Sequence, residues 1–325
     1  MQSFRKFLIA LTLLLIWWGR SIACDVCGSF IGIHPGDKKA YVSMFYRYVS
    51  FSGSHTTNST FFPDGGMRIG HTDHAGSNAN SSKDFEVYRA AEWRARYYLH
   101  SRIELSVIAP YVFNTAYENS KRTRNSGLGD LSTLLGWQMI NEASTGKFNH
   151  RLLLGAGVKW GIGDENQKVN NERLSILLQP GTGSNDVLFF ANYQLGRGNW
   201  SWNVLPMYKI NGKNQFEERV SNSTTFFSSI SYQWKRNENF KVMPSIQSYF
   251  ESMNGVEVSG EKLAGTSMEE LFLGPGVDLF YKNIGFSSSG WWSVMQNQNE
   301  SMMTSRIRYR AGITWYFNQD SFLFN

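Results

Sequence analysis

An alternation of apolar and polar residues between positions 84 and 113 limits the possible folds of this chain most strongly. Most odd positions there are apolar, and four even positions between Phe85 and Leu99 are charged. A period of two is that of a β-strand with one apolar and one polar face. The apolar odd positions are Phe85, Val87, Ala91, Trp93, Ala95, Tyr97, Leu99, Ile103, Leu105, Val107, Ala109, Tyr111 and Phe113. The charged even positions between Phe85 and Leu99 are Glu86, Glu92, Arg94 and Arg96.

Two folds are compatible with this hairpin. Four charges on one face are too many for an ordinary hydrophobic core. A soluble β-sandwich would bury the apolar face and leave the charges in bulk water. A membrane β-barrel would turn the apolar face to lipid and the charges into a wet lumen. The rest of the sequence must show which of these two folds the chain adopts.

Twelve segments of the chain share the period of two, each roughly 10 to 16 residues long. Pro244 and Pro275 interrupt two of them, which weakens those strands. The segments outside residues 84–113 are Ala40–Phe51, Leu128–Ile140, Arg151–Gly163, Asp186–Leu195, Trp200–Ile210, Thr224–Trp234, Phe240–Phe250, Glu270–Tyr281, Ile284–Val294 and Met302–Phe317.

The connections between these segments alternate in length. Short turns follow the even-numbered strands, whereas the links after odd-numbered strands are mostly longer and polar, and Ser52–Lys83 is the longest. Short turns on one side and long loops on the other are typical of outer-membrane barrels. The sequence therefore predicts an all-β, transmembrane antiparallel β-barrel of about 12 strands. A secreted soluble β-protein is the alternative.

The composition favours the barrel. Aromatic residues make up 15% of the chain, although its mean hydropathy is only −0.34. Aromatic girdles at both membrane interfaces and a weak hydropathy signal per strand are typical of such barrels. We expect the tryptophans to anchor the barrel in the bilayer. The belt includes Trp93, Trp137, Trp160, Trp200, Trp202, Trp291, Trp292 and Trp315.

The N-terminus indicates export. Arg5 and Lys6 precede a twelve-residue, mostly apolar run, and Ser21-Ile22-Ala23 supplies the small residues of a cleavage site. This pattern predicts a cleaved signal peptide over residues 1–23. The run is short for a spanning helix, which needs about 20 residues; a retained N-terminal anchor is the alternative.

The mature chain then divides into a periplasmic segment over residues 24–39, a barrel over 40–317 and a tail over 318–325. The predicted location is the bacterial outer membrane, with outer-membrane lipid as a partner. Trp315-Tyr316-Phe317 fits the aromatic final strand that the barrel-assembly machinery reads. The formal net charge of the whole chain is +6, and the signal peptide contributes much of it. The remainder is too small to indicate nucleic-acid binding.

Several stretches resemble a known family over roughly residues 85 to 317. Gly127-Leu128-Gly129-Asp130 and Pro180-Gly181-Thr182-Gly183 are the most specific. The chain resembles the outer-membrane proteins named for the meta-pathway of phenol degradation. It departs from the usual Pro-Thr-Gly-like turn at residues 161–163. The resemblance implies a barrel and the uptake of small, often aromatic, compounds. The stretches are Arg102–Val112, Ser126–Trp137, Leu154–Asp164 and Gln179–Leu188.

The charges on the predicted inner face are candidate pore-lining residues. In a closed barrel the last strand lies against the first, so the charges of the last and second strands lie near one another. They could form an ion-pair ladder that sizes the pore and favours anions. Alternatively, they could form a polar network that only fills the interior of a small barrel. The candidates are Glu86, Glu92, Arg94, Arg96, Arg306, Arg308 and Arg310.

Metal binding and catalysis have weaker support. Cys24 and Cys27 form a lone CxxC, which is open to a disulfide or free pair, a soft-metal site or lipid modification at Cys24. His71 and His74, which lie in the longest loop, could ligate a metal. The alternative is a solvated, mobile loop that binds no metal. No histidine lies within a strand beside a candidate serine, so we expect neither an enzyme nor a cofactor.

The sequence thus predicts an outer-membrane channel for passive uptake of small solutes, which are expected to be hydrophobic or aromatic. The alternative is a non-conducting barrel that acts in surface binding, adhesion or metal binding. The two hypotheses differ in whether the lumen is open.

Overall fold

The structure is a computed structural model that describes several stretches of the chain. The predicted signal peptide, Cys24, Cys27, His71 and His74 lie outside the described residues. Within these stretches, no helix is long and apolar enough to cross a bilayer. The described residues are 39–53, 84–118, 121–142, 148–237, 239–263, 266–298 and 304–318.

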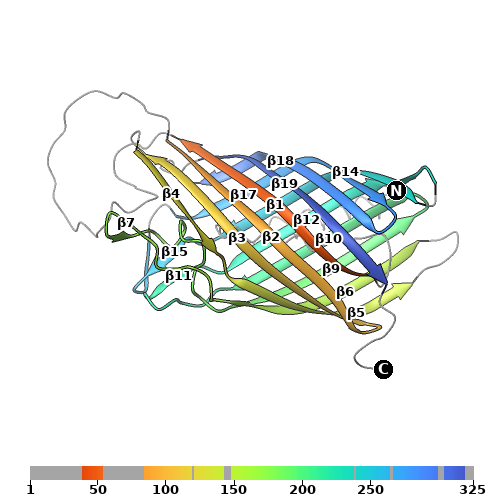
Figure 1. Cartoon of the computed structure of the whole chain (residues 1–325), viewed down its shortest axis with the longest axis horizontal. Helices are drawn as coiled ribbons and strands as arrows, with labels where there is room; N and C mark the ends of the chain where they lie inside the picture. The colour runs from red at the N-terminus through yellow and green to blue at the C-terminus, as the bar shows by residue number, and fades with distance from the viewer. Residues whose placement is uncertain are drawn as a thin grey trace, which may run out of the picture.

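The described chain forms a closed, antiparallel barrel, which confirms the predicted fold class (Figure 1). The first and last strands pair from Lys39↔Asn318 onward, and β12 pairs with β14. Twelve wall positions result, because β4 and β5 share one. They are β1 (Lys39–Gly53), β2 (Asp84–His100), β3 (Ile103–Glu118), β4 (Lys121–Leu128) with β5 (Leu131–Glu142), β6 (Asn149–Trp160), β9 (Asp186–Arg197), β10 (Trp200–Ile210), β12 (Ser223–Tyr232), β14 (Phe240–Met253), β17 (Met268–Tyr281), β18 (Ile284–Gln298) and β19 (Thr304–Asn318).

The shared position is one strand broken in two. β3 pairs with β4 over Tyr111–Glu118 and with β5 over Ile103–Ile108, and Gly129 and Asp130 separate the two pieces. The sequence places residues 114–127 in a connection, whereas residues 114–118 and 121–127 form paired parts of β3 and β4. Their polar sequence hides the strand pattern, because strand ends beyond the lipid need no apolar face.

The two ends of the barrel differ, as the connection lengths predict. One end, the turn end, carries short turns such as Ser101–Arg102 and Lys282–Asn283. The other end, the loop end, carries long connections that fold on their own (Figure 1). These connections contain β7 (Lys168–Val169), β8 (Glu172–Arg173), β11 (Glu218–Val220), β15 (Val256–Val258) and β16 (Glu261–Lys262). β11, β15 and β16 form a small separate sheet, and β13 (Trp234–Lys235) extends the wall beside β14.

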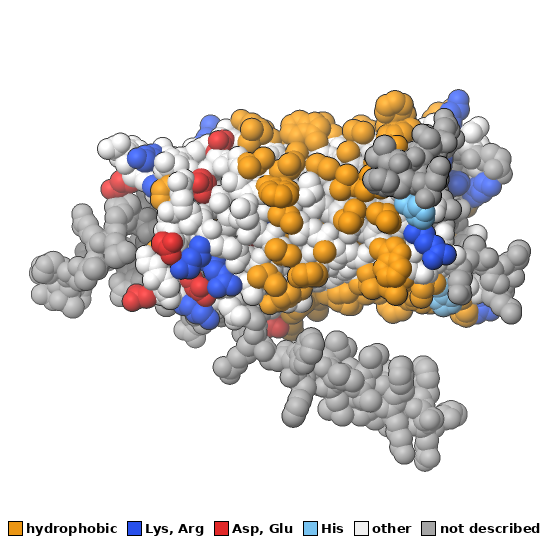
Figure 2. Space-filling model, turned by 90° about the horizontal axis from the view of Figure 1, so that it is seen from below, with side chains coloured by type: hydrophobic (Ala, Val, Ile, Leu, Met, Phe, Trp, Pro, Cys, Tyr) orange, Lys and Arg blue, Asp and Glu red, His pale blue; other side chains and the backbone are white. Residues whose placement is uncertain are grey.

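Apolar side chains form a band around the outside of the barrel, and charged side chains gather at the two ends (Figure 2). Seven of the eight predicted belt tryptophans are exposed on this band, but Trp291 is only 3% exposed. Successive side chains of a strand point to opposite faces, so adjacent Trp291 and Trp292 cannot both face lipid. The expectation for Trp291 is therefore wrong: its indole lies inside the barrel.

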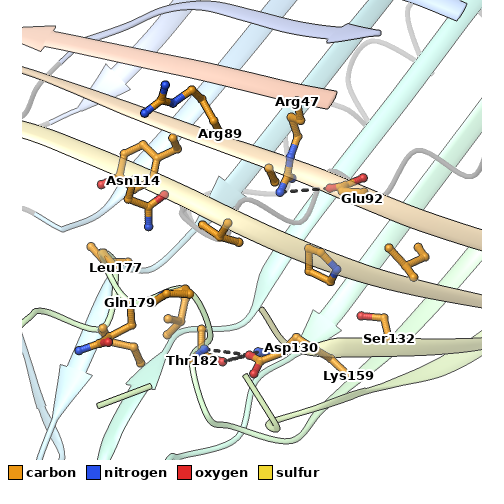
Figure 3. Close-up of a pocket in the computed structure, with 18 residues that line it drawn as sticks. Arg47, Arg89, Glu92, Asn114, Asp130, Ser132, Lys159, Leu177, Gln179 and Thr182 are labelled. Carbon is orange, nitrogen blue, oxygen red and sulfur yellow. Dashed lines mark hydrogen bonds and ion pairs between the residues drawn. The ribbon is translucent and has the colours of Figure 1, made fainter. Parts of the chain in front are cut away.

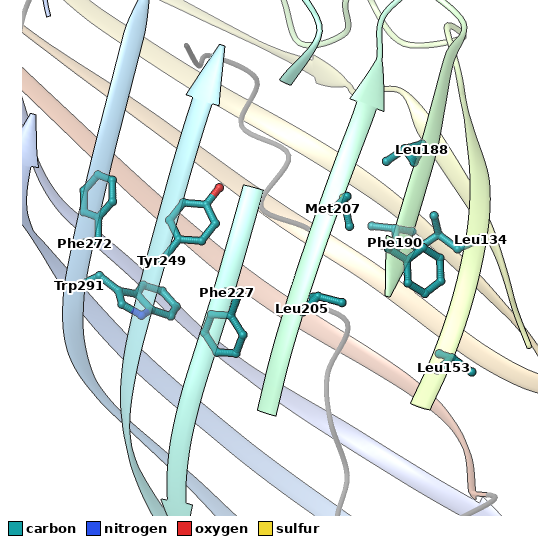
Figure 4. Packing of buried hydrophobic residues seen from close by; sticks show 11 residues of the cluster. Leu134, Leu153, Leu188, Phe190, Leu205, Met207, Phe227, Tyr249, Phe272 and Trp291 are labelled. Carbon is teal, nitrogen blue, oxygen red and sulfur yellow. The ribbon is translucent and has the colours of Figure 1, made fainter. Parts of the chain in front are cut away.

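The interior combines apolar and charged surfaces. A cluster of buried apolar side chains lines β3 through β18 (Figure 4). The inward charges of β19, β1 and β2 lie on the remaining part of the wall. A second apolar cluster joins the wall to the connections at the loop end. The first cluster is Ile108, Leu134, Leu153, Leu188, Phe190, Leu205, Met207, Phe227, Tyr249, Phe272 and Trp291.

Candidate functional site: the barrel interior

The inward charges of β1 and β2 form one ionic group. Glu92 is 4% exposed, and its Oε1 lies 3.2 Å from Arg47 Nη2. Arg94 Nε donates to Glu92 Oε2 at 3.1 Å. The guanidinium groups of Arg94 and Arg310 lie 4.9 and 5.0 Å from the Phe45 ring centroid. Because one carboxylate faces several arginines, this group keeps a net positive charge.

A second ionic group lies where the charged part of the wall meets the apolar part. Arg308 on β19 bonds Glu251 on β14, and its Nη2 donates to Glu270 Oε2 on β17 at 2.9 Å. The Arg308 guanidinium also lies 4.1 Å from the Phe272 ring centroid and 5.3 Å from that of Tyr249. One cation is therefore shared by two buried carboxylates and two aromatic faces.

A third group lies toward the turn end. Arg96 and Arg151 approach Glu104 with N···O distances of 3.8 and 3.7 Å. The Arg96 guanidinium lies 4.6 Å from the Tyr41 ring centroid. Glu104 is 2% exposed. These longer contacts again place two cations beside one acid.

A fourth group fastens residues 161–185 to the wall. Lys159 Nζ lies 2.8 Å from both Asp130 Oδ2 and Asp186 Oδ2. Asp130 also accepts the Thr182 backbone N–H and hydroxyl at 2.8 Å each, and the Gly163 N–H at 3.1 Å. Asp130 and Thr182 belong to the two most specific motifs of the sequence. The structure brings these motifs together through hydrogen bonds.

The predicted pore-lining residues mostly lie where the alternation places them. Glu86, Glu92, Arg94 and Arg96 are buried on the inward face, and Glu86 accepts the Tyr88 hydroxyl at 2.6 Å. Arg308 and Arg310 also belong to the interior groups. Whether any of these side chains lines an open pore remains a prediction.

Arg306 does not join the interior groups. It is exposed, and its Nε donates to Ser52 Oγ at 2.5 Å. The pairing of β1 and β19 shifts between Ser50↔Ile307 and Phe51↔Ser305, so Arg306 is the extra residue of a bulge. A bulge breaks the alternation of faces. The three arginines of β19 therefore do not form one continuous stack.

Sequence reasoning missed several partners of these charges. All of them except the half-buried Arg47 are buried, and each belongs to one of the four ionic groups, since Lys209 lies 3.9 Å from Asp186. Counting every second residue along each strand would have identified most of them, because every second side chain of a strand faces the interior. Their pairing across the barrel has no sequence signal. The missed residues are Arg47, Glu104, Asp130, Asp186, Lys209, Glu251 and Glu270.

A cavity of about 90 Å³ lies between β2, β3 and residues 176–182 (Figure 3). Its volume suits about three water molecules. Arg47 Nε and Asn114 Oδ1 are buried beside it and have no hydrogen-bond partner among the described residues. Asn114 Nδ2 donates to the Leu178 carbonyl oxygen at 2.8 Å. The apolar lining comes from Ile108, Pro110, Val112, Ile176, Leu177 and Val220.

Metal ligation has no candidate within the described residues, where no three His, Cys, Asp or Glu side chains are placed to hold an ion. The candidates Cys24, Cys27, His71 and His74 fall outside those stretches. Their roles remain predictions.

Comparison with known proteins identifies the family. Residues 28–294 match the family described as "Putative MetA-pathway of phenol degradation". The chain belongs to this family. The resemblance read from the sequence motifs is thereby confirmed. No curated protein matches the chain.

Solved structures give the fold. A crystal structure of an outer membrane channel from Pseudomonas putida F1 matches with a TM-score of 0.56 at 14% identity, covering 88% of this chain and 100% of that chain. The β domain of the Bordetella autotransporter BrkA matches with a TM-score of 0.47 at 9% identity, covering 86% and 100%. At such low identity, the first match shows a shared barrel fold and no more.

Proposed function

We propose that this protein is an outer-membrane channel for passive uptake of small solutes with an apolar body. The loop end would face the outside of the cell, and Lys39 and Asn318, where the described chain enters and leaves the barrel, would face the periplasm. The proposal involves no cofactor and no catalytic residue. It agrees with membership of a family named for phenol degradation and with the apolar outer band.

The two-sided interior carries this proposal. A porin for hydrophilic solutes has a polar interior, whereas here eleven apolar side chains line β3 through β18. Apolar surface stabilises a solute by roughly 25 cal/mol per Å² of apolar area removed from water. The ionic groups of the same interior can hydrogen-bond a hydroxyl or other polar substituent. A phenol-like solute combines both features.

The ionic groups favour such solutes over simple anions. Glu92 lies between Arg47 and Arg94, and Arg308 lies between Glu251 and Glu270. Cations and anions are therefore interleaved, and the wall offers a passing ion little net charge. We infer that ion selectivity is weak, and that the ladder sizes the passage.

Transit requires the loop end to rearrange. Residues 161–185 and the small sheet pack over the interior through apolar contacts, among them Ile176, Leu178 and Val256. Arg173 Nη1 donates to Glu218 Oε1 at 2.6 Å and ties two of these connections together. The cavity of about 90 Å³ is too small for a substituted ring, so loading it would displace these connections.

Uptake by intact cells tests the proposal. Cells that produce the protein are compared with cells that lack it, using a radiolabelled alkylphenol and a labelled disaccharide. We expect faster uptake of the alkylphenol only. Leu205→Asn and Phe227→Asn, which place amides in the apolar interior, should slow it several-fold. Phe226→Asn, on the exposed face of the same strand, is the matched control.

Heat modifiability on gels verifies that every variant is folded. Equal alkylphenol uptake with and without the protein would overturn the channel assignment. The alternative of a non-conducting, surface-binding barrel would then gain support.

A further inference from the structure

The outward face of β2, β3 and β4 near the loop end carries three arginines. On β2 the residues flanking Arg89, Tyr88 and Ala90, are buried toward the interior, so Arg89 lies on the opposite face. Arg124 pairs directly with Thr115 of β3 in the register. Arg122 lies two residues from Arg124 and therefore shares its face.

These side chains are arranged around one hydroxyl. Arg89 Nη2 donates to Thr115 Oγ1 at 3.0 Å, and Thr115 is 5% exposed. In the register Thr115 pairs with Val87 on β2, two residues from Arg89, and with Arg124 on β4. Arg89 and Arg124 therefore flank this hydroxyl from the two neighbouring strands.

An aromatic wall borders the same patch. The Phe85 and Tyr117 rings stack with centroids 4.1 Å apart, and the Arg122 guanidinium lies 5.2 Å from the Tyr117 ring centroid. Stacking against an aromatic face orients a guanidinium. The patch therefore has an apolar border as well as a charged centre.

The charge of this patch is not neutralised within the described chain. The interior arginines share carboxylates, but no described Asp or Glu forms an ion pair with Arg89, Arg122 or Arg124. Arg89 Nε is buried with no hydrogen-bond partner among the described residues. A strongly acidic ligand would complete this arrangement.

The depth of the patch indicates the source of that ligand. Arg89 lies four residues from Trp93 of the exposed band, toward the loop end. Four residues span about 13 Å along a strand, or roughly 9 Å along the membrane normal at a tilt near 45°. Arg89 therefore lies nearer to the loop end than Trp93, which in the proposed orientation is the side of the outer-leaflet headgroups.

We propose that Arg89, Arg124 and Thr115, supported by Arg122, bind a phosphate group of the phosphorylated glycolipid in the outer leaflet. Guanidinium groups pair with phosphate through two parallel hydrogen bonds. The border of Phe85 and Tyr117 suits the acyl chains and sugar of a lipid better than free phosphate. This inference rests on the proposed location and orientation, but it does not require that the barrel conducts.

Native mass spectrometry of the full chain in detergent tests the proposal, with diphosphorylated lipid A and its dephosphorylated form as probes. We expect phosphate-dependent retention of lipid A. The double variant Arg89→Gln/Arg124→Gln should retain about tenfold less, as expected when charge-assisted hydrogen bonds are lost. Arg197→Gln is the matched control, because Arg197 also lies near a ring, 5.0 Å from the Phe148 centroid, but at the turn end.

Three results would overturn the proposal: equal retention by the double variant, equal retention of dephosphorylated lipid A, or full displacement by millimolar inorganic phosphate. Alkylphenol uptake is measured on the same variants. Lost lipid retention with normal uptake supports the lipid site and leaves the channel assignment intact. Normal phosphate-dependent retention in a protein that transports nothing supports the lipid site and overturns only the channel.

Discussion

Arg308 and Glu270 form an ion pair between two strands that are not neighbours in the barrel wall. Nη2 of Arg308 on β19 lies 2.9 Å from Oε2 of Glu270 on β17, and β18 runs between them. Arg308 also bonds Glu251 on β14, one strand further. This guanidinium therefore crosses the curvature of the interior and holds together wall segments that share no backbone hydrogen bonds.

Removing the charge of Arg308 should destabilise the barrel strongly. Arg308→Gln leaves Glu251 and Glu270 buried near each other without a cation, and breaking such buried pairs costs about 3 to 5 kcal/mol. We expect a lower temperature of heat modification on gels. Adding Glu270→Gln should recover part of the loss, because it removes one orphaned acid. No recovery in the double variant would contradict this account.

Reversing the charge should alter ion preference if the interior conducts. Arg308→Glu places a third carboxylate beside Glu251 and Glu270, so the reversal potential under a salt gradient should move toward cation preference in planar bilayers. Arg306→Glu, at the exposed bulge, serves as the control and should change little. Discrete conductance steps with unchanged selectivity would show that Arg308 does not line the conducting path.

Asp130 should control the attachment of residues 161–185. Asp130→Asn removes the negative charge that pairs with Lys159 and accepts the Thr182 N–H. Losing one partner of a buried ion pair lowers stability by about 3 kcal/mol. We expect faster hydrogen exchange at Thr182 and Gly163. Asp164→Asn is the control, because the exposed Asp164 carboxylate accepts only the Leu128 N–H at 3.0 Å among the described contacts. Equal hydrogen-exchange rates in the two variants would contradict this role of Asp130.

Two glycines of adjacent strands should differ in their tolerance of alanine. A Cβ at Gly274 would lie 1.8 Å from the Gly290 carbonyl oxygen, whereas a Cβ at Gly290 would meet nothing within 4 Å. Gly274→Ala must move backbone, so we expect less folded protein in the outer-membrane fraction. Gly290→Ala should accumulate normally. Similar amounts of both variants on heat-modifiability gels would contradict the close approach of these strands.

The neighbouring indoles of β18 should report opposite environments. Trp292 is 51% exposed on the outer face, and Trp291 is 3% exposed inside. In vesicles of brominated lipid, Trp292→Phe should reduce the quenchable fluorescence, and Trp291→Phe should leave the quenched part unchanged. A larger loss with Trp291→Phe would reverse the assignment of faces on this strand.

The sequence by itself determined the wall of this barrel. A period of two sets which side chains face lipid and which face the interior, and it does so locally, since successive residues of a strand must alternate. The alternation over Phe85–Phe113 therefore placed Glu92, Arg94 and Arg96 inside, and the uneven connections marked the two ends.

Only the tertiary structure decided how the interior is organised. Arg308 meets Glu251 and Glu270 because closure of the wall brings β19, β17 and β14 around one lumen, and no local pattern encodes contacts between residues so far apart. A single bulge moved Arg306 out of the ladder. Register, bulges and closure depend on the summed pairing of all strands, which is why individual strands are readable from sequence and their partnerships across the barrel are not.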